Sequence, residues 1–432
     1  MARAGFAKIP ITPPLGVELA GYGVYLERHA TEVHDDLFAR GLALEDDAGE
    51  RVLLLSLDLV GLSWELSGAI AAQAADATGL DVERVLVSST HTHSGPAPLL
   101  MEGWGQMEPS YVERIPVQCA AVATEAIAAL HPVRIGTAQS TVRGLGFNRV
   151  RRNGPIDRNL HVMRIDSFSG TPEAVLFSHG CHPVSIDRRT SAGTAISADW
   201  PGQVGRRLQE EGYGEAIFRL GVWGDIDPVV AWHQFAFEGM ELSGEVVTQS
   251  LLGVLRSIDT APGLQLRLAH GNVQLPLERL SEEDVATVLA EAQTGYGSVR
   301  VTDSGVDNSA WLQFYGAWAE AMRAQLATQP EHVAVPLAAL RVNDEVWLHL
   351  PGEVFTALGQ AIAARSPLPR PWSRHCLDPL SAISLILKTS RQADTPRLLC
   401  RGYFICRRTG QRWTMPWLPE RWLYSRAWRV EE

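Results

Sequence analysis

Apolar runs of strand length alternate with longer helix-like stretches along most of this chain, and this alternation limits the folds open to it. Residues 52–60 read VLLLSLDLV, which predicts a buried strand, and the alanine-rich residues 64–78 predict a helix. Further strands are predicted at residues 84–89, 133–142, 161–165, 174–179, 216–222, 264–275, 332–342 and 346–350. Further helices are predicted at residues 110–130, 202–211, 239–257, 282–292 and 310–327. We therefore expect an α/β fold, a mixed β-sheet core flanked by helices, with no internal repeat recognisable in the sequence.

The net charge of the chain limits the kinds of molecule that it is expected to bind. The 432 residues carry a formal net charge of −11. Nucleic acids and anionic membrane surfaces attract basic faces, so an acidic chain of this kind is not expected to bind either. A small-molecule or lipid substrate remains, and nothing in the sequence fixes the oligomeric state.

Cysteine usage and hydropathy bear on location. Five cysteines at irregular spacing suggest neither a disulfide framework nor a zinc ribbon. The first residues, MARAGFAKIPITPPLG, lack the apolar core of a signal peptide, and no apolar run is long enough to span a membrane. These features predict a cytoplasmic protein without a transmembrane segment.

Three strand ends carry residues suited to chemistry. SSTHTHSGP (residues 88–96) holds His91 and His93, FSHGCHPVSI (residues 177–186) holds His179 and His182, and HLPGEVFT (residues 349–356) holds Glu353. Each has a structural alternative: the first two histidines as turn residues, His179 as a core residue, and Glu353 as a partner of the helix dipole. Three ligands from separate strand ends, with a position left for water, are typical of a catalytic zinc site. The chain contains no HExxH, GxSxG, P-loop or Rossmann glycine motif.

Six motifs together make the pattern specific. THTHSGP, GFNR, HGCHPVSI, ISADWPG, GDIDP and LPGEVFT occur in the order typical of the neutral/alkaline (non-lysosomal) ceramidases. The segments AKIPITPPLGVELAGYG and VHDDLFARGLAL are similar too. Residues 4 to 368 therefore resemble the catalytic domain of that family.

This resemblance implies a zinc-dependent hydrolase that cleaves an N-acyl amide bond, ceramide-like or another linear amide, through zinc-activated water. It implies His91, His182 and Glu353 as the ligands of Zn²⁺. His93 and Arg149 match family residues that contact the reacting amide.

Two aspartates lie within the same family motifs. Asp199 belongs to ISADWPG and Asp225 to GDIDP, and we expect both to orient the metal ligands.

One residue departs from the family pattern. Asp227 stands where ceramidases have serine, which leaves the binding of ceramide itself in doubt. Two alternatives therefore stay open: a catalytically impaired, ceramidase-like binding protein, or an intracellular esterase or amidase acting on small non-lipid substrates.

The chain changes character near Pro371. Five of thirteen tryptophans and three of five cysteines follow that residue, and the family's tyrosine-ligand segment is missing. Back-translated and read two bases along, SAISLILKTSRQADTP gives GYLPDPEDFAAGGYA, which closely resembles that segment. We expect a catalytic domain over residues 1–370 and, after a frameshift, an atypical and poorly ordered tail over residues 371–432. Sequencing the gene through this region tests the hypothesis.

Overall fold

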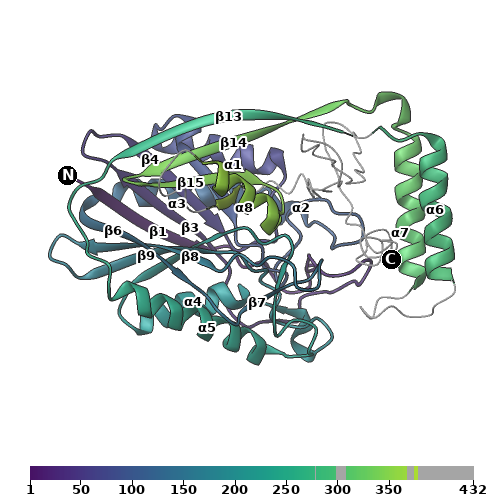
Figure 1. Cartoon of the computed structure of the whole chain (residues 1–432), viewed down its shortest axis with the longest axis horizontal. Helices are drawn as coiled ribbons and strands as arrows, with labels where there is room; N and C mark the ends of the chain where they lie inside the picture. The colour runs from purple at the N-terminus through teal and green to yellow at the C-terminus, as the bar shows by residue number, and fades with distance from the viewer. Residues whose placement is uncertain (278, 298–307, 367–373, 378–432) are drawn as a thin grey trace.

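The computed structural model describes all residues except 278, 298–307, 367–373 and 378–432. Its centre is an eight-stranded mixed sheet with the strand order β11-β9-β8-β6-β1-β3-β4-β5. Helices cover the strands on two sides, α1 and α3 on one and α4 and α5 on the other (Figure 1). The predicted fold class is therefore confirmed.

Four strands and two helices make up the first half of the sheet. β1 pairs with β3 and β3 with β4 in antiparallel fashion, whereas β4 and β5 are parallel. Helix α1 connects the two parallel strands, and α3 follows the last one. The elements are β1 (Arg3–Pro10), β3 (Phe38–Glu45), β4 (Arg51–Leu57), α1 (Trp64–Thr78), β5 (Val85–Ser89) and α3 (Ile115–Ala128).

The second half repeats this plan. β6 pairs with β8 and β8 with β9 in antiparallel fashion, and β9 runs parallel to β11. Helix α4 lies between the parallel strands in the chain and α5 follows them. The elements are β6 (His131–Thr141), β8 (Asn159–Ser167), β9 (Pro172–His179), α4 (Asp199–Glu210), β11 (Glu215–Leu220) and α5 (Phe237–Leu255).

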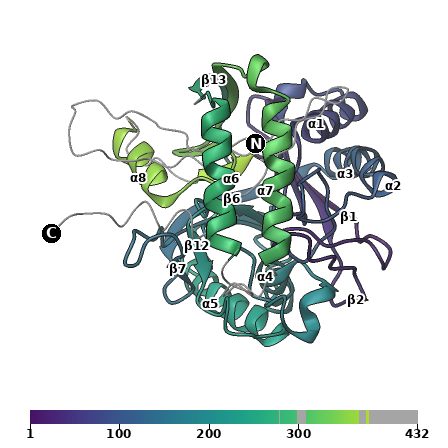
Figure 2. The same ribbon diagram turned by 90° about the vertical axis from the view of Figure 1, so that its right-hand side faces the viewer.

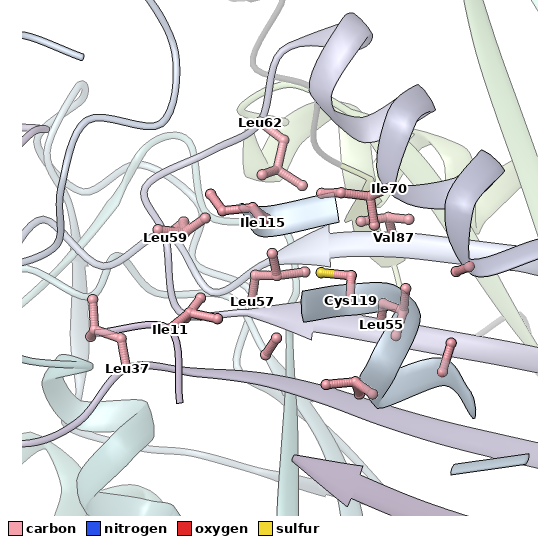
Figure 3. Packing of buried hydrophobic residues seen from close by; sticks show 14 of the residues in the cluster. Ile11, Leu37, Leu55, Leu57, Leu59, Leu62, Ile70, Val87, Ile115 and Cys119 are labelled. Carbon is pink, nitrogen blue, oxygen red and sulfur yellow. The ribbon is translucent and has the colours of Figure 1, made fainter. Parts of the chain in front are cut away.

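Helix α1 shows how the sequence forms the outer layers. The Ser63 side chain accepts a hydrogen bond from the Leu66 amide and caps the first turn. Gly79, with a φ of 71°, ends the helix in the left-handed conformation that glycine adopts without steric cost. The buried face of the helix places Ile70 against Val87 of the sheet (Figure 3). Burial of such a side chain stabilises the fold by about 1.5–3 kcal/mol.

A second apolar layer lies between the two halves of the sheet. Leu54 and Leu86 from the first half share one buried cluster with Leu176 and Ile217 from the second. The Ser56 hydroxyl donates a hydrogen bond to a backbone carbonyl of β11 over 2.7 Å. The halves thus pack face to face, and each helix layer covers an outer face.

A long arm extends from this body. β13 (Leu266–Pro276) and β14 (His332–Val342) form an antiparallel ribbon that leads to α6 (Glu282–Gly297) and α7 (Asn308–Arg323), which lie side by side (Figures 1 and 2). Buried aromatic side chains of α7 pack with Val24. The arm therefore packs against a loop of the first half.

β15 (Glu345–Pro351) returns antiparallel to β14 and leads to α8 (Thr356–Arg365). β16 (Arg374–Leu377) pairs with β15 in parallel. Most of the tail predicted over residues 371–432 lies outside the described residues.

Short elements complete the described chain. They are β2 (Glu32–Val33), η1 (Val82–Arg84), α2 (Pro109–Val112), β7 (Gly146–Asn148), η2 (Ser191–Thr194), β10 (Ala195–Ile196), β12 (Ile226–Pro228) and η3 (Leu326–Thr328). Among the described helices, none combines the length and apolar character that crossing a bilayer requires.

Candidate metal centre

His91 follows the end of β5 and is 1% exposed. Its backbone has a φ of 69°, which is uncommon for a residue other than glycine and typical of strained functional positions. Nδ1 lies 2.5 Å from the carbonyl oxygen of Val60, in the loop after β4. Because a carbonyl only accepts, Nδ1 carries the proton and the Nε2 lone pair is free to bind a metal.

His182 is held in the same way from the second half. It follows β9, and its Nδ1 lies 2.9 Å from the carbonyl oxygen of Ile226, after β11. Its Nε2 is buried and has no hydrogen-bond partner. The Trp223 ring lies 5.3 Å from the His91 ring and 6.2 Å from the His182 ring, centroid to centroid, so it packs against both.

Glu353 approaches both imidazoles from the segment between β15 and α8. One carboxylate oxygen lies 3.5 Å from His91 Nε2 and the other 3.6 Å from His182 Nε2. The first of these oxygens is buried without a hydrogen-bond partner. Gly224 holds this segment close, because a Cβ there would come within 2.5 Å of the Glu353 carbonyl oxygen.

His93 is a fourth possible ligand. Its Nε2 lies 3.2 Å from that of His91, and the ligand atoms of His91, His93 and His182 all lie within 4.8 Å of one another. The Tyr22 ring meets the His93 ring edge-on at 5.0 Å. The geometry thus allows either the predicted set of two histidines and Glu353 or a set of three histidines.

Burial sets the protonation states in this centre. It lowers the pKa of His91 to about 3, with the charge of Arg149 acting in the same direction. The pKa values of His93 and His182 are also well below their usual range, chiefly through burial. Burial raises the pKa of Glu353 to about 8 against the opposing charge of Arg149. At neutral pH the imidazoles are uncharged, as metal ligands must be.

Arg149 and Asp227 form an ion pair at the side of the centre. Arg149 lies 3.3 Å from a carboxylate oxygen of Asp227 and 3.4 Å from one of Glu353. The same oxygen of Asp227 lies 3.5 Å from His182 Nδ1, and the other accepts a hydrogen bond from the Trp232 indole. Asp227 is fully buried, so its carboxylate belongs to the centre itself.

Asp225 joins two of the segments that meet here. Its carboxylate accepts hydrogen bonds from the amide and hydroxyl of Thr356, the first residue of α8, and from the side chain of Asn148. Asn148 precedes Arg149, and Thr356 lies three residues after Glu353. Asp225 therefore ties together the two segments that carry Arg149 and Glu353.

Asp199 lies further from the centre. Its carboxylate accepts hydrogen bonds from the amides of Ser185, Ile186 and Trp200, although burial raises its pKa to about 6. The Trp200 indole donates to the His182 carbonyl over 3.1 Å. The Asp199 carboxylate thus binds backbone amides shortly after His182, and its hydrogen bonds within the described part of the chain include no imidazole.

Several site residues had no role assigned from the sequence. Val60 and Ile226 contribute only carbonyl oxygens, which leave no signal in the residue type. Tyr22 lies in AKIPITPPLGVELAGYG and Trp223 directly precedes GDIDP, but their contact with the imidazoles depends on tertiary packing. His179 matches its core alternative: it is buried, with Nδ1 2.9 Å from a backbone oxygen of β8.

The donor set fits a metal ion. Uncharged imidazole nitrogens converge with a carboxylate in a buried space, and two donor atoms lack hydrogen-bond partners. Fold and site therefore define an α/β protein with a buried, histidine-rich centre at its strand ends, able to hold a divalent metal.

Comparison with known proteins agrees with this class. The chain is 29% identical over 102 residues to the neutral ceramidases of Drosophila pseudoobscura pseudoobscura and Drosophila melanogaster. The match spans 23% of this chain but only 14% of those proteins. No family model matches the chain.

Solved structures extend the likeness over most of the fold. The neutral ceramidase of Pseudomonas aeruginosa superposes with a TM-score of 0.63 at 18% identity, covering 84% of this chain and 64% of that one. A ceramidase complexed with C2 gives 0.66 at 17% identity, covering 87% and 68%. The resemblance to neutral ceramidases is confirmed, in sequence over part of the chain and in fold over most of it.

Proposed function

We propose that this chain is a zinc-dependent amidohydrolase that cleaves N-acyl amide bonds of ceramide-like or other linear amides. The supporting observation is the convergence of His91 Nε2, His182 Nε2 and the Glu353 carboxylate from three distant segments, with the two Nδ1 atoms fixed by carbonyls. We assign these three residues as the ligands. The ceramidase likeness supports the choice of an amide substrate.

A bound zinc ion supplies a Lewis acid and lowers the pKa of coordinated water to about 7. The chain's own residues do the rest. The carbonyls of Val60 and Ile226 keep both imidazoles in the tautomer whose Nε2 carries no proton. Trp223 covers them and excludes water, which strengthens electrostatic interactions inside the centre.

Two residues act on the reacting amide. Arg149 holds a permanent positive charge beside Glu353 and stabilises the negative charge that develops on the carbonyl oxygen. His93, with its ring positioned by Tyr22, takes up the proton that the attacking water loses and passes it to the leaving amine.

A second candidate function rests on Asp227. Its carboxylate already engages Arg149, which reduces the positive charge available to the substrate. This observation favours a ceramidase-like binding protein that holds an amide without turning it over. An esterase or amidase for small non-lipid substrates uses the same centre.

The test is metal content followed by turnover. The full chain, purified without a metal-binding tag, is expected to hold about one zinc per molecule and to hydrolyse acyl amides faster than matched esters. EDTA should abolish turnover and zinc should restore it. Bound zinc without hydrolysis of any amide or ester would favour the binding protein, and failure to bind zinc would refute the ligand assignment.

A further inference from the structure

Two consecutive arginines follow His182 by a few residues, and they differ in their partners. Arg189 contacts the Asp187 carboxylate through its Nε and one terminal nitrogen, at 2.9 and 2.5 Å. Arg188 makes no hydrogen bond or ion pair with the described residues, and one of its terminal nitrogens is buried without a partner. The more exposed arginine thus contacts the carboxylate directly, whereas the more buried Arg188 only feels its charge.

A second buried guanidinium lies near Arg188. Arg28 donates only to backbone carbonyls, those of Gly193, Ala20 and His93, and its Nε has no partner. Gly193 also lies against Arg188, because a Cβ on this glycine would come within 2.1 Å of the Arg188 carbonyl oxygen. Burial lowers the pKa of Arg28 to about 10, and the charge of Arg188 acts in the same direction.

Tyr22 links these cations to the metal centre. Its ring packs on His93, the Arg28 guanidinium lies 4.7 Å from the ring centroid, and its hydroxyl donates to the Ile186 carbonyl over 2.8 Å. Arg188 is two residues beyond Ile186 and lies near enough to Tyr22 that ionisation of the phenol would raise the pKa of Arg188. The unpartnered nitrogens of the two guanidinium groups therefore belong to residues next to Tyr22, on the His93 side of the centre.

We propose that Arg188 and Arg28, beside Tyr22, form a subsite for an oxyanion of the substrate, either a carboxylate or a phosphate. A buried guanidinium nitrogen without an acceptor is unfavourable, and a bound oxyanion supplies acceptors for the unpartnered nitrogens of Arg188 and Arg28 through charge-assisted hydrogen bonds. The inference rests on the proposed function and narrows it: the preferred substrate is an acyl amide that carries an anionic group.

The experiment uses three probes with one acyl chain: N-dodecanoylglycine, the phosphate ester of N-dodecanoylethanolamine, and neutral N-dodecanoylethanolamine. Dissociation constants are measured on the metal-free full chain, and kcat/KM on the zinc-loaded chain. We expect at least one anionic probe to bind about tenfold or more tightly than the neutral one. The stronger of the two identifies the oxyanion.

Arg188→Gln should reduce this preference to within about twofold and leave the affinity for the neutral probe unchanged, which also shows that the variant folds. Arg188→Lys should keep part of the preference, because it keeps the charge but not the guanidinium fork. Arg207→Gln, which removes a half-exposed arginine of α4 that pairs with Glu210, is the matched control and should behave as wild type.

Equal binding of all three probes by the wild type, or a preference that survives Arg188→Gln, would overturn the subsite. Failure of the proposed function has a different signature. In that case the zinc-loaded chain hydrolyses none of the probes, while the metal-free chain still distinguishes them.

Discussion

The two halves of the sheet share one arrangement of strands and helices, but the loops that carry the imidazole and the carbonyl are exchanged between them. Each has two antiparallel pairings, one parallel pairing, a helix between the parallel strands and another after them. In the first half His91 follows the fourth strand, and Val60, after the third, supplies the carbonyl. In the second half His182 follows the third strand, and Ile226, after the fourth, supplies the carbonyl.

This exchange of imidazole and carbonyl between the two loops shows what the shared arrangement of strands contributes to the site. Adjacent parallel strands bring two loops together at their carboxyl ends, the usual location of sites in α/β folds. Either loop can carry the imidazole as long as the other presents a carbonyl. The proposed metal centre thus draws one imidazole and one carbonyl from each half, although the sequences of the halves show no repeat.

The strongest test of this equivalence is to remove each imidazole. His91→Ala and His182→Ala should each lose the bound zinc and lower kcat/KM by about a thousandfold or more, because two remaining ligands hold the ion weakly. Metal analysis and amide hydrolysis measure both effects. His179→Gln, in the same motif as His182, is the control and should keep the metal. Retained zinc in either alanine variant would show that the halves are not equivalent.

His93 of the first half has no counterpart in the described second half. Its removal distinguishes the ligand set of two histidines and Glu353 from the set of three histidines. With His91, His182 and Glu353 as ligands, His93→Ala should keep zinc and lower kcat by about a hundredfold, the usual contribution of a positioned proton donor. The zinc content of the purified variant distinguishes the sets. Loss of the metal would instead identify three histidines as the ligands.

Glu353 belongs to neither half, and pH should reveal its contribution. Its pKa is raised to about 8 in the metal-free centre, so the acid form dominates below that pH and zinc must displace a proton. Zinc affinity should therefore rise about tenfold per pH unit towards pH 8 and then level off.

The histidines, whose pKa values are lowered, add no further slope at neutral pH. Calorimetry in buffers of different ionisation enthalpy measures the proton released. At pH 6, where zinc-bound water keeps its proton, Glu353→Gln should release almost none. An unchanged proton release in that variant would exclude the carboxylate as a ligand.

The smallest expected change in activity concerns an aspartate–arginine pair beside each loop that supplies a carbonyl, the loop of Val60 and the loop of Ile226. Asp58 contacts Arg40 at 2.6 Å in the first half, and Asp227 contacts Arg149 at 3.3 Å in the second. Asp227→Ser should raise kcat/KM for neutral amides by about three- to tenfold, because it frees the charge of Arg149. Asp58→Ser should lower the melting temperature but leave kcat/KM unchanged. A fall in activity with Asp227→Ser would mean that the pair is needed to position Arg149.

Much of the fold was predictable where a pattern is local. The helix predicted at residues 64–78 matches α1 in full, because its buried residues recur at helical spacing. β1 and β3 were not predicted, since RAGFAKIP and FARGLALE interrupt their apolar residues with charged ones and with glycine. Their place in the sheet depends on pairing with each other and with β4.

For the site, the sequence by itself predicted the donors, imidazoles and a carboxylate at three strand ends, and the structure brings these groups together. It also revealed Asp227 as a departure, and the structure places that residue against Arg149. The tail prediction depends on residues outside those described.

Only the tertiary structure decided how the donors are used. The two halves are alike in their strand pairing, which is made by backbone hydrogen bonds, and residue identities do not reveal which strands pair. The tautomers of His91 and His182 depend on carbonyls from other loops. The missing partner of Arg188 is likewise visible only in three dimensions, because whether a buried charge is compensated depends on which side chains fold around it.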